Sequence, residues 1–482
     1  MKPFSQFILP ISFAFLALNS AFATNKPNIV IILADDLGYG DVGCFNPKSK
    51  IKTPNLDRLA REGIKFTDAH APGAVCIPSR YGLMTGRYPF RGRMNPKAQA
   101  VIEPGRMTIA SLLQQSGYTT AMIGKWHLGF DGGDNFDYTK PLRGGPIDCG
   151  FDSFFGIHAS TDIPPYFYIQ NDRATAPAIN RIEASNTPGW SPIQGAFWRE
   201  GAIAPEMKLD DVMPTFTSKT VEALESFRKR GDQKPFFLYV AFTAPHTPWL
   251  PLKEFDERSK AGLYGDWVSQ VDDSVGKILK AIDKAGAREN TLVFFTSDNG
   301  PAWYPEDVKR FGHSSTGNMR GMKGDVWEGG HRVPFIARWP KRIKAGAKTD
   351  EAISFTDFMA TLATLTKTKL PDDAGEDSFD ISPALFGEPC KNSIRKAIVS
   401  TSSKGLLAIR QCEWKLINGP GSGGFTKFPG APGEVGQLYN LAKDPGEKIN
   451  LWEKEPEIVN RLSALLEKFR QNGRSRPLTL AK

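Results

Sequence analysis

The sequence predicts an α/β protein with a largely parallel sheet flanked by helices, followed by a small antiparallel sheet with one helix. Short, nearly continuous apolar runs alternate with amphipathic helical stretches over most of the chain. This alternation is typical of strands that are buried on both faces and joined by helices. Beyond about residue 383 the pattern changes to short alternating segments that end in one amphipathic helix.

Three apolar runs are the clearest strand candidates, namely Asn28–Leu33, Phe236–Val240 and Leu292–Phe295. The clearest helix is 267–285, whose apolar residues form one stripe and which is followed by a glycine, the residue favoured just past a helix end. A shorter helix is expected at Asn55–Glu62. The C-terminal elements are expected at Lys396–Ser400, Gly405–Arg410, Glu413–Ile417, Leu438–Leu441 and, as a helix, Pro456–Arg470.

Composition indicates a globular protein with a large core. The 482 residues are 40% hydrophobic and 23% charged, which excludes disorder for most of the length. The 46 glycines and 36 prolines follow no period, so we expect many ordered loops and no collagen. The net charge of +9 is spread without a block of five like charges, which favours a mixed solvated surface over a nucleic-acid partner.

An export signal is predicted over residues 1–23. Lys2 precedes the apolar run 7–18, and Ala21 to Ala23 has the small-residue pattern of a cleavage site. No later run approaches the roughly 20 apolar residues that a membrane span needs. Since the chain also lacks an Asn-x-Ser/Thr acceptor, we expect a bacterial protein, periplasmic or secreted after cleavage near Ala23.

The chain has five cysteines, an odd number for an exported protein. One of them is therefore either a buried free thiol or a modified or reactive residue, and composition does not choose between these. The five are Cys44, Cys76, Cys149, Cys390 and Cys412.

Polar residues follow the three strand candidates. Asp35 and Asp36 come after the first, Asp298 and Asn299 after the last, and His246 after the middle one. Ligands of open α/β sheets bind at the carboxyl ends of the strands, and carboxylate and amide oxygens suit Ca²⁺ or Mg²⁺. The alternative is that each Asp or Asn only caps a helix or a turn.

Cys76 lies in a second unusual segment, Cys76-Ile77-Pro78-Ser79-Arg80, before a helix-competent stretch that ends at Gly86. This places the cysteine near a helix N-terminus, where the helix dipole and Arg80 both favour an anion. The alternative is a small buried side chain with no chemical role.

Cys76-x-Pro-Ser-Arg80, followed by Leu83-x-Thr85-Gly86-Arg87, resembles the signature of the formylglycine-dependent sulfatases, arylsulfatase-like members of the alkaline-phosphatase superfamily. Further segments resemble that family in order along the chain: Asn28–Asp36, Gly124–Gly129, Pro245–Pro248, Ser297–Gly300, Gly321–Gly330 and Leu438–Leu451. The resemblance implies an alkaline-phosphatase-like sheet in a catalytic domain at 24–385 and a C-terminal α+β subdomain at 386–482. It also implies a maturation enzyme that oxidises Cys76 to formylglycine.

The resemblance further implies the roles of individual residues. One divalent cation, usually Ca²⁺ with Mg²⁺ as the alternative, would be held by Asp35, Asp36, Asp298, Asn299 and modified residue 76. The hydrated aldehyde at position 76 would be the nucleophile, with Asp298 as its proton acceptor and with Arg80 and His127 holding it. Lys125 and Lys323 would neutralise the sulfate, and His246 would protonate the leaving alcohol.

The sequence indicates the residues that select the substrate less clearly than it indicates the catalytic ones. Residues 160–205 are polar, aromatic and proline-rich without a clear period, so we expect a surface excursion that could select a sulfated saccharide. His313 lies in a Gly/Ser-rich loop before Lys323 and is expected either to reach the substrate or to remain in a surface loop.

Two other functions remain open. One is a phosphate or phosphonate ester hydrolase of the same superfamily, although two-metal phosphatases need more His and Asp ligands than the six histidines readily provide. The other is a non-catalytic relative that binds sulfated glycans, which would be expected to have lost Cys76, Lys125 or a metal ligand. The sequence does not indicate which position is sulfated or whether the action is endo or exo. It also does not indicate the oligomeric state or any disulfide pairing.

Overall fold

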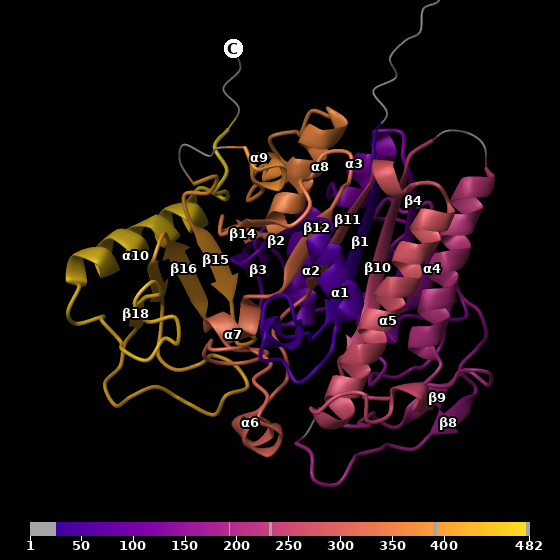
Figure 1. Cartoon of the computed structure of the whole chain (residues 1–482), viewed down its shortest axis with the longest axis horizontal. Helices are drawn as coiled ribbons and strands as arrows, with labels where there is room; N and C mark the ends of the chain where they lie inside the picture. The colour runs from indigo at the N-terminus through magenta and orange to yellow at the C-terminus, as the bar shows by residue number, and fades with distance from the viewer. Residues whose placement is uncertain (1–25, 192, 231–233, 389–392, 479–482) are drawn as a thin grey trace, which may run out of the picture.

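The computed structural model describes residues 26–191, 193–230, 234–388 and 393–478. A ten-stranded sheet forms its centre, in the order β13-β2-β12-β11-β1-β10-β4-β5-β6-β7 (Figure 1). Strands β11, β1, β10, β4 and β5 run parallel, and β12 and β6 are their antiparallel neighbours. The strands of this sheet are β1 (Asn28–Asp35), β2 (Ile64–Phe66), β4 (Thr119–Lys125), β5 (Ser153–Ile157), β6 (Ile169–Gln170), β7 (Arg173–Ala174), β10 (Phe236–Pro245), β11 (Thr291–Ser297), β12 (Phe335–Arg338) and β13 (Ala347–Thr349).

Two groups of helices flank the sheet. Helices α1, α4 and α5 pack on one another and on β10 and β12, whereas α2, α3 and α8 pack together near β4. The helices are α1 (Pro54–Arg61), α2 (Cys76–Thr85), α3 (Ile109–Gln115), α4 (Val212–Lys229), α5 (Gly262–Lys284), α6 (Pro305–Phe311), α7 (Glu328–His331), α8 (Phe358–Thr366), α9 (Ser382–Phe386) and α10 (Pro456–Gln471). Short 3-10 turns lie at Tyr39–Asp41, Pro89–Arg91, Gly133–Asn135, Lys253–Phe255, Arg288–Asn290 and Phe355–Asp357.

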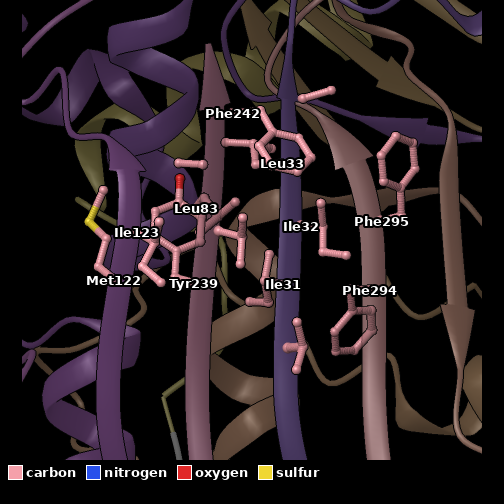
Figure 2. Close-up of a cluster of buried hydrophobic side chains, with 14 of the residues drawn as sticks. Ile31, Ile32, Leu33, Leu83, Met122, Ile123, Tyr239, Phe242, Phe294 and Phe295 are labelled. Carbon is pink, nitrogen blue, oxygen red and sulfur yellow. The ribbon is translucent and has the colours of Figure 1, made fainter. Parts of the chain in front are cut away.

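The apolar runs predicted from the sequence form the buried centre of the sheet. All of β10 and β11, and β1 after its first residue, are buried, because helices cover these strands. Figure 2 shows side chains from neighbouring strands, among them Ile31 and Ile32 of β1 and Phe294 and Phe295 of β11. The predicted α/β class is therefore confirmed.

The C-terminal part forms a separate four-stranded antiparallel sheet, as predicted. Its order is β15-β16-β17-β18, and α10 packs on β16 and β17 (Figure 1). The strands are β15 (Ile398–Thr401), β16 (Leu407–Gln411), β17 (Trp414–Ile417) and β18 (Gln437–Asn440). The exact boundary between 24–385 and 386–482 remains a prediction.

Residues 160–205 are more ordered than expected, and their first part, 160–169, is largely buried, whereas most of the described remainder lies at the surface. Strands β6 and β7 extend the edge of the main sheet, and β8 (Asn180–Ile182) pairs with β9 (Gly201–Ile203). Tyr166 and Phe167 are buried against the main core, which explains why the excursion folds onto the sheet edge. A further small pair joins β3 (Ala69–His70) to β14 (Ile353–Ser354).

The predicted export signal at residues 1–23 lies outside the described residues and remains a prediction. Every helix among the described residues falls short of the length and apolar character needed to cross a bilayer.

Candidate active site

Four adjacent strands carry polar residues at their carboxyl ends. Asp35 is the last residue of β1 and Lys125 the last of β4, while His246 and Asp298 directly follow β10 and β11. Because these strands are parallel neighbours, their ends meet at one edge of the sheet. We use the name strand-end cluster for Asp35, Asp36, Cys76, Arg80, Lys125, Asp298, Asn299 and Lys323.

Cys76 is the first residue of α2 and is only 5% exposed. Its Sγ lies 3.2 Å from Asp35 Oδ1 and 3.4 Å from Lys125 Nζ. Burial raises the pKa of the thiol well above its usual value, and Asp298 and Asp35 raise it further. The unmodified thiol therefore remains protonated at neutral pH and is a poor nucleophile.

Four ion pairs join cations to acids in this cluster: Arg80 pairs with both Asp298 and Asp35, Lys125 with Asp35, and Lys323 with Asp36. Arg80 donates from Nε and Nη2 to Asp298 Oδ2 at 3.0 and 2.8 Å. Lys323 Nζ lies 2.7 Å from Asp36 Oδ2. Burial and the neighbouring Asp35 nevertheless raise the pKa of Asp298 to about 6. The three carboxylates of the cluster are matched by its three cations, and burial is the main cause of the raised pKa of Asp298.

The donor set fits a divalent cation. Asn299 Nδ2 donates to Asp36 Oδ1 at 2.7 Å, whereas the buried Asn299 Oδ1 has no hydrogen-bond partner within the described ranges. One ligand atom from each of Asp35, Asp36, Cys76 and His246 lies within 4.8 Å of the others. Several carboxylates beside an unsatisfied amide oxygen are the hard ligands that Ca²⁺ and Mg²⁺ bind.

Two histidines complete the surroundings of Cys76. His127 has a positive φ of 59°, and its buried Nδ1 has no hydrogen-bond partner. Burial lowers the pKa of His127 well below its usual value, and Lys125 lowers it further, so the ring stays neutral. His246 Nδ1 lies 2.6 Å from the Thr247 carbonyl oxygen, while Nε2 lies 3.8 Å from Asp36 Oδ2.

A cavity of about 750 Å³ opens onto this region. Cys76, His127, His246 and Lys323 contribute to its lining. Its other walls come from three regions. The segment after α2 contributes Phe90 and Met94, the excursion contributes Ser160, Asp162 and Arg199, and the C-terminal part contributes residues such as Ser402, Leu406 and Arg470. The sequence carried no signal that the C-terminal part would reach the cavity, because that contact depends on how the two sheets pack.

The structure places His313 neither at the substrate cavity nor in an exposed surface loop. It is buried, its Nε2 lies 2.8 Å from Asp41 Oδ1, and it is absent from the lining of the cavity. The same carboxylate accepts hydrogen bonds at Oδ2 from Ser315 and Tyr264. His313 therefore anchors the loop that leads to Lys323, and a direct contact with substrate is not supported by this position.

A second buried cluster of ionisable groups lies where β3 and α7 meet the C-terminal sheet. His70 Nδ1 is 3.1 Å from His331 Nδ1, and Lys415 Nζ is 3.0 Å from Glu328 Oε1 and 2.8 Å from Glu447 Oε1. We call these five residues the interface cluster. The sequence did not single out this cluster, because its members are far apart along the chain and carry no shared motif.

The four described cysteines are all free. Burial raises the pKa of both Cys44 and Cys149 to about 12, and Cys412 is exposed. Cys390 lies outside the described residues, so its pairing remains open.

Comparison with known proteins identifies the family. The sulfatase family model matches residues 27–368, which span the whole strand-end cluster. The chain belongs to the sulfatase family. As a sulfatase it is a sulfuric ester hydrolase, and the resemblance noted in the sequence motifs is confirmed.

Individual sulfatases match most of the chain. It is 33% identical to an N-acetylgalactosamine-6-O-sulfatase of Bacteroides thetaiotaomicron, over 92% of this chain and 93% of the relative. It is 35% identical to human arylsulfatase A, over 90% and 85%. A structure from work on glycosaminoglycan metabolism by Bacteroides thetaiotaomicron superposes with a TM-score of 0.81 at 32% identity, over 93% of this chain and 100% of that one.

Proposed function

We propose that this sulfatase hydrolyses sulfate esters of saccharides, with a formylglycine made from Cys76 and one bound divalent cation. The observation that carries the proposal is the convergence of the acids and cations at the strand ends, where Cys76 and Lys323 line a cavity that also has a polar wall. The relatives that act on an N-acetylgalactosamine sulfate and in glycosaminoglycan metabolism support a saccharide as the substrate class.

Asp35, Asp36, Asp298 and Asn299 would hold the cation, which would neutralise charge on the non-bridging sulfate oxygens. Formylglycine, as its hydrate, would supply an oxygen nucleophile that the protonated thiol of Cys76 does not. Both groups fit the residues present, given the unsatisfied Asn299 oxygen and the raised pKa of the thiol.

The chain's own cations bind the sulfate group. Lys125 and Lys323 lie on either side of the two acids Asp35 and Asp36, and neighbouring acids raise the pKa of both lysines despite their burial. Both ammonium groups therefore stay charged. Fixed cations in a buried site stabilise negative charge more strongly than solvent does.

His246 is placed to protonate the leaving alcohol. Its Nδ1 lies 2.6 Å from the Thr247 carbonyl oxygen, so we infer that Nδ1 carries a hydrogen and donates it there. When the ring is in its protonated form, Nε2 carries the second hydrogen, and this is the proton that would pass to the leaving alcohol. The backbone contact fixes the ring through Nδ1 and so leaves Nε2 as the nitrogen that donates the proton.

A phosphate or phosphonate ester hydrolase is the rival reaction. A second metal would need further His and Asp ligands near the strand-end cluster, but His70 and His331 lie in the interface cluster and His313 pairs with Asp41. The geometry therefore favours the single-cation reaction.

The test is release of sulfate from defined sulfated saccharides, measured beside the matched phosphate ester of one alcohol. We expect sulfate release to exceed phosphate release by at least about 100-fold, and chelation followed by Ca²⁺ addition to abolish and restore it. Peptide mass mapping of the active protein should show residue 76 as the aldehyde. Faster phosphate release, or an alkylatable thiol at position 76 in fully active protein, would refute the proposal.

Export is a separate part of the proposal. It rests on the segment 1–23, and the N-terminal sequence of protein recovered from a bacterial periplasm or medium tests it. A mature N-terminus near residue 24 supports export, and an intact Met1 in that fraction contradicts cleavage.

A further inference from the structure

Asp162 presents an unusual group to the cavity. It is 2% exposed and lines the cavity, yet its Oδ1 has no hydrogen-bond partner among the described residues. The hydroxyl of Ser160, two residues earlier, is also buried, lines the cavity and lacks a partner in the same part of the chain. Buried polar atoms are nearly always hydrogen-bonded, so two neighbouring exceptions at a cavity wall point to a ligand that supplies the partners.

Arg199 fixes the orientation of Asp162. Its Nη1 donates to the Asp162 carbonyl oxygen at 3.1 Å and also pairs with Oδ2, and its backbone N–H donates to the same carbonyl at 3.2 Å. Arg199 is held in turn by Tyr166, whose hydroxyl donates to its carbonyl oxygen at 2.6 Å. These contacts occupy Oδ2 and leave Oδ1 as the free acceptor.

Another role for Asp162 fits the distances poorly. Its Oδ1 lies 3.9 Å from His246 Nδ1, beyond hydrogen-bond reach, and that nitrogen already lies 2.6 Å from the Thr247 carbonyl oxygen. The free oxygen is therefore available to a molecule in the cavity.

An ionised carboxylate accepts hydrogen bonds and donates none. A ligand that satisfies Asp162 must therefore present a hydroxyl or an N–H at this wall. Other parts of the lining are apolar, through Phe90, Met94, Leu406 and Phe425. A pyranose ring has both a hydroxyl-bearing edge and a C–H face, whereas an aryl or steroid ester fills the apolar surface and leaves Asp162 unpaired.

We propose that Asp162, oriented by Arg199, determines the specificity of this sulfatase for hydroxylated substrates by accepting a hydrogen bond from a saccharide hydroxyl through Oδ1. This inference rests on the saccharide function proposed above and names the residue that distinguishes saccharide from aryl or steroid esters. Sites that hydrogen-bond a substrate hydroxyl reject analogues lacking it, because the buried group is then left unpaired.

The test compares kcat/KM of the metal-loaded, matured enzyme for a sulfated saccharide and for 4-nitrophenyl sulfate. We expect Asp162→Ala and Asp162→Asn to lower kcat/KM for the saccharide about 10- to 100-fold, mainly through KM, and to change that for the aryl ester less than about threefold. Arg199→Gln should change the same ratio in the same direction, because it releases Asp162 from its fixed orientation.

Asp172→Asn is the matched control. Asp172 lies in the same excursion, has a partly exposed side chain 3.9 Å from Arg143, and does not line the cavity. We expect it to leave both substrates unchanged. If Asp162→Ala does not fold, Asp162→Asn and Arg199→Gln decide the question.

The outcomes separate the two proposals. If the wild-type enzyme fails on every saccharide and hydrolyses the aryl ester, the saccharide function is wrong before any variant is made. If the wild-type enzyme prefers the saccharide and the Asp162 variants keep that preference, or lose both activities equally, only the role of Asp162 is wrong.

Discussion

The strand-end cluster and the interface cluster share their composition but differ in what their atoms contact. Both are buried and combine carboxylates with lysines, and each includes or adjoins histidines. The strand-end cluster lies at a cavity, and polar atoms there, such as Asn299 Oδ1 and His127 Nδ1, have no partner. In the interface cluster Lys415 bridges Glu328 and Glu447, and the two histidines face each other.

This difference shows that a buried group of His, Asp and Glu does not by itself identify an active site. His331 contacts Lys415 at 3.2 Å, and the ammonium group occupies the position where a cation would be needed. Ion pairs within the interface cluster therefore join α7 to the C-terminal sheet, whereas the free acceptors of the strand-end cluster are available to ligands. The following predictions test that contrast.

The largest effect is expected from Cys76→Ala. If Cys76 is the precursor of the nucleophile, sulfate release should fall at least about 1,000-fold, because no other described thiol lies in the strand-end cluster. The midpoint temperature of thermal unfolding should change little, because Cys76 contacts groups that bind ligands and does not hold the C-terminal part against the rest of the protein. Cys412→Ala, at an exposed thiol, is the control and should keep full activity. Retained activity in Cys76→Ala would rule out this role.

The next effect is expected from Lys415→Met. Removing the ammonium leaves Glu328 and Glu447 buried without their shared cation, so the free energy of unfolding should fall by about 3 kcal/mol. Urea unfolding measures this loss. Sulfate release per folded molecule should not change, because Lys415 is absent from the cavity lining.

Lys443→Met, at an exposed lysine, should leave stability within about 0.5 kcal/mol of the wild-type value. Adding Glu447→Gln to Lys415→Met should restore part of the loss, since one of the two unpaired carboxylates is then neutral. A large loss of activity without a loss of stability would show that the interface cluster is not structural.

The smallest effect is a change of stability with pH. Burial lowers the pKa of both His70 and His331, so the folded state keeps these rings neutral while the unfolded chain binds protons below about pH 6.5. Their contribution to stability is therefore complete above that pH and is lost as the pH falls. The loss should reach about 1.4 kcal/mol per pH unit for each histidine.

Glu447 titrates in the opposite sense and must be separated from the histidines. Burial, together with the neighbouring Glu328, raises its pKa to about 7, so its contribution is present at low pH and lost as the pH rises through 7. Urea unfolding at pH 5.5 and 7 should show a smaller pH dependence in His331→Gln than in the wild-type protein. Equal slopes in the two proteins would contradict the assignment.

The strand-end cluster could be predicted from the sequence because each of its members lies next to a recognisable local pattern. Asp35, Asp298 and His246 follow apolar runs, and parallel strands bring such ends together. The orientation of Asp162 could not be predicted in this way, because it depends on Arg199, which is 37 residues away. The pairing of His70 with His331 spans 261 residues and depends on the packing of β3 against α7.

The same limit applies to the excursion at 160–205. Its short strands β6 and β7 have two residues each, too few for a period to be visible. The sheet edge provides their hydrogen-bond partners, and tertiary packing therefore determines their conformation. Likewise, the Gly/Ser-rich loop at His313 favoured an exposed side chain, but the imidazole ring is buried and pairs with Asp41.

The cavity walls come from both the main sheet and the C-terminal part, and this has a thermodynamic consequence. A saccharide that touches Asp162 on one wall and Leu406 or Arg470 on the other binds only when the two parts are docked. By mass action, each tenfold increase in its concentration above Kd then adds about 1.4 kcal/mol to the stability of the docked state. Bound substrate thus stabilises the contact between the two parts of the enzyme and does so reversibly.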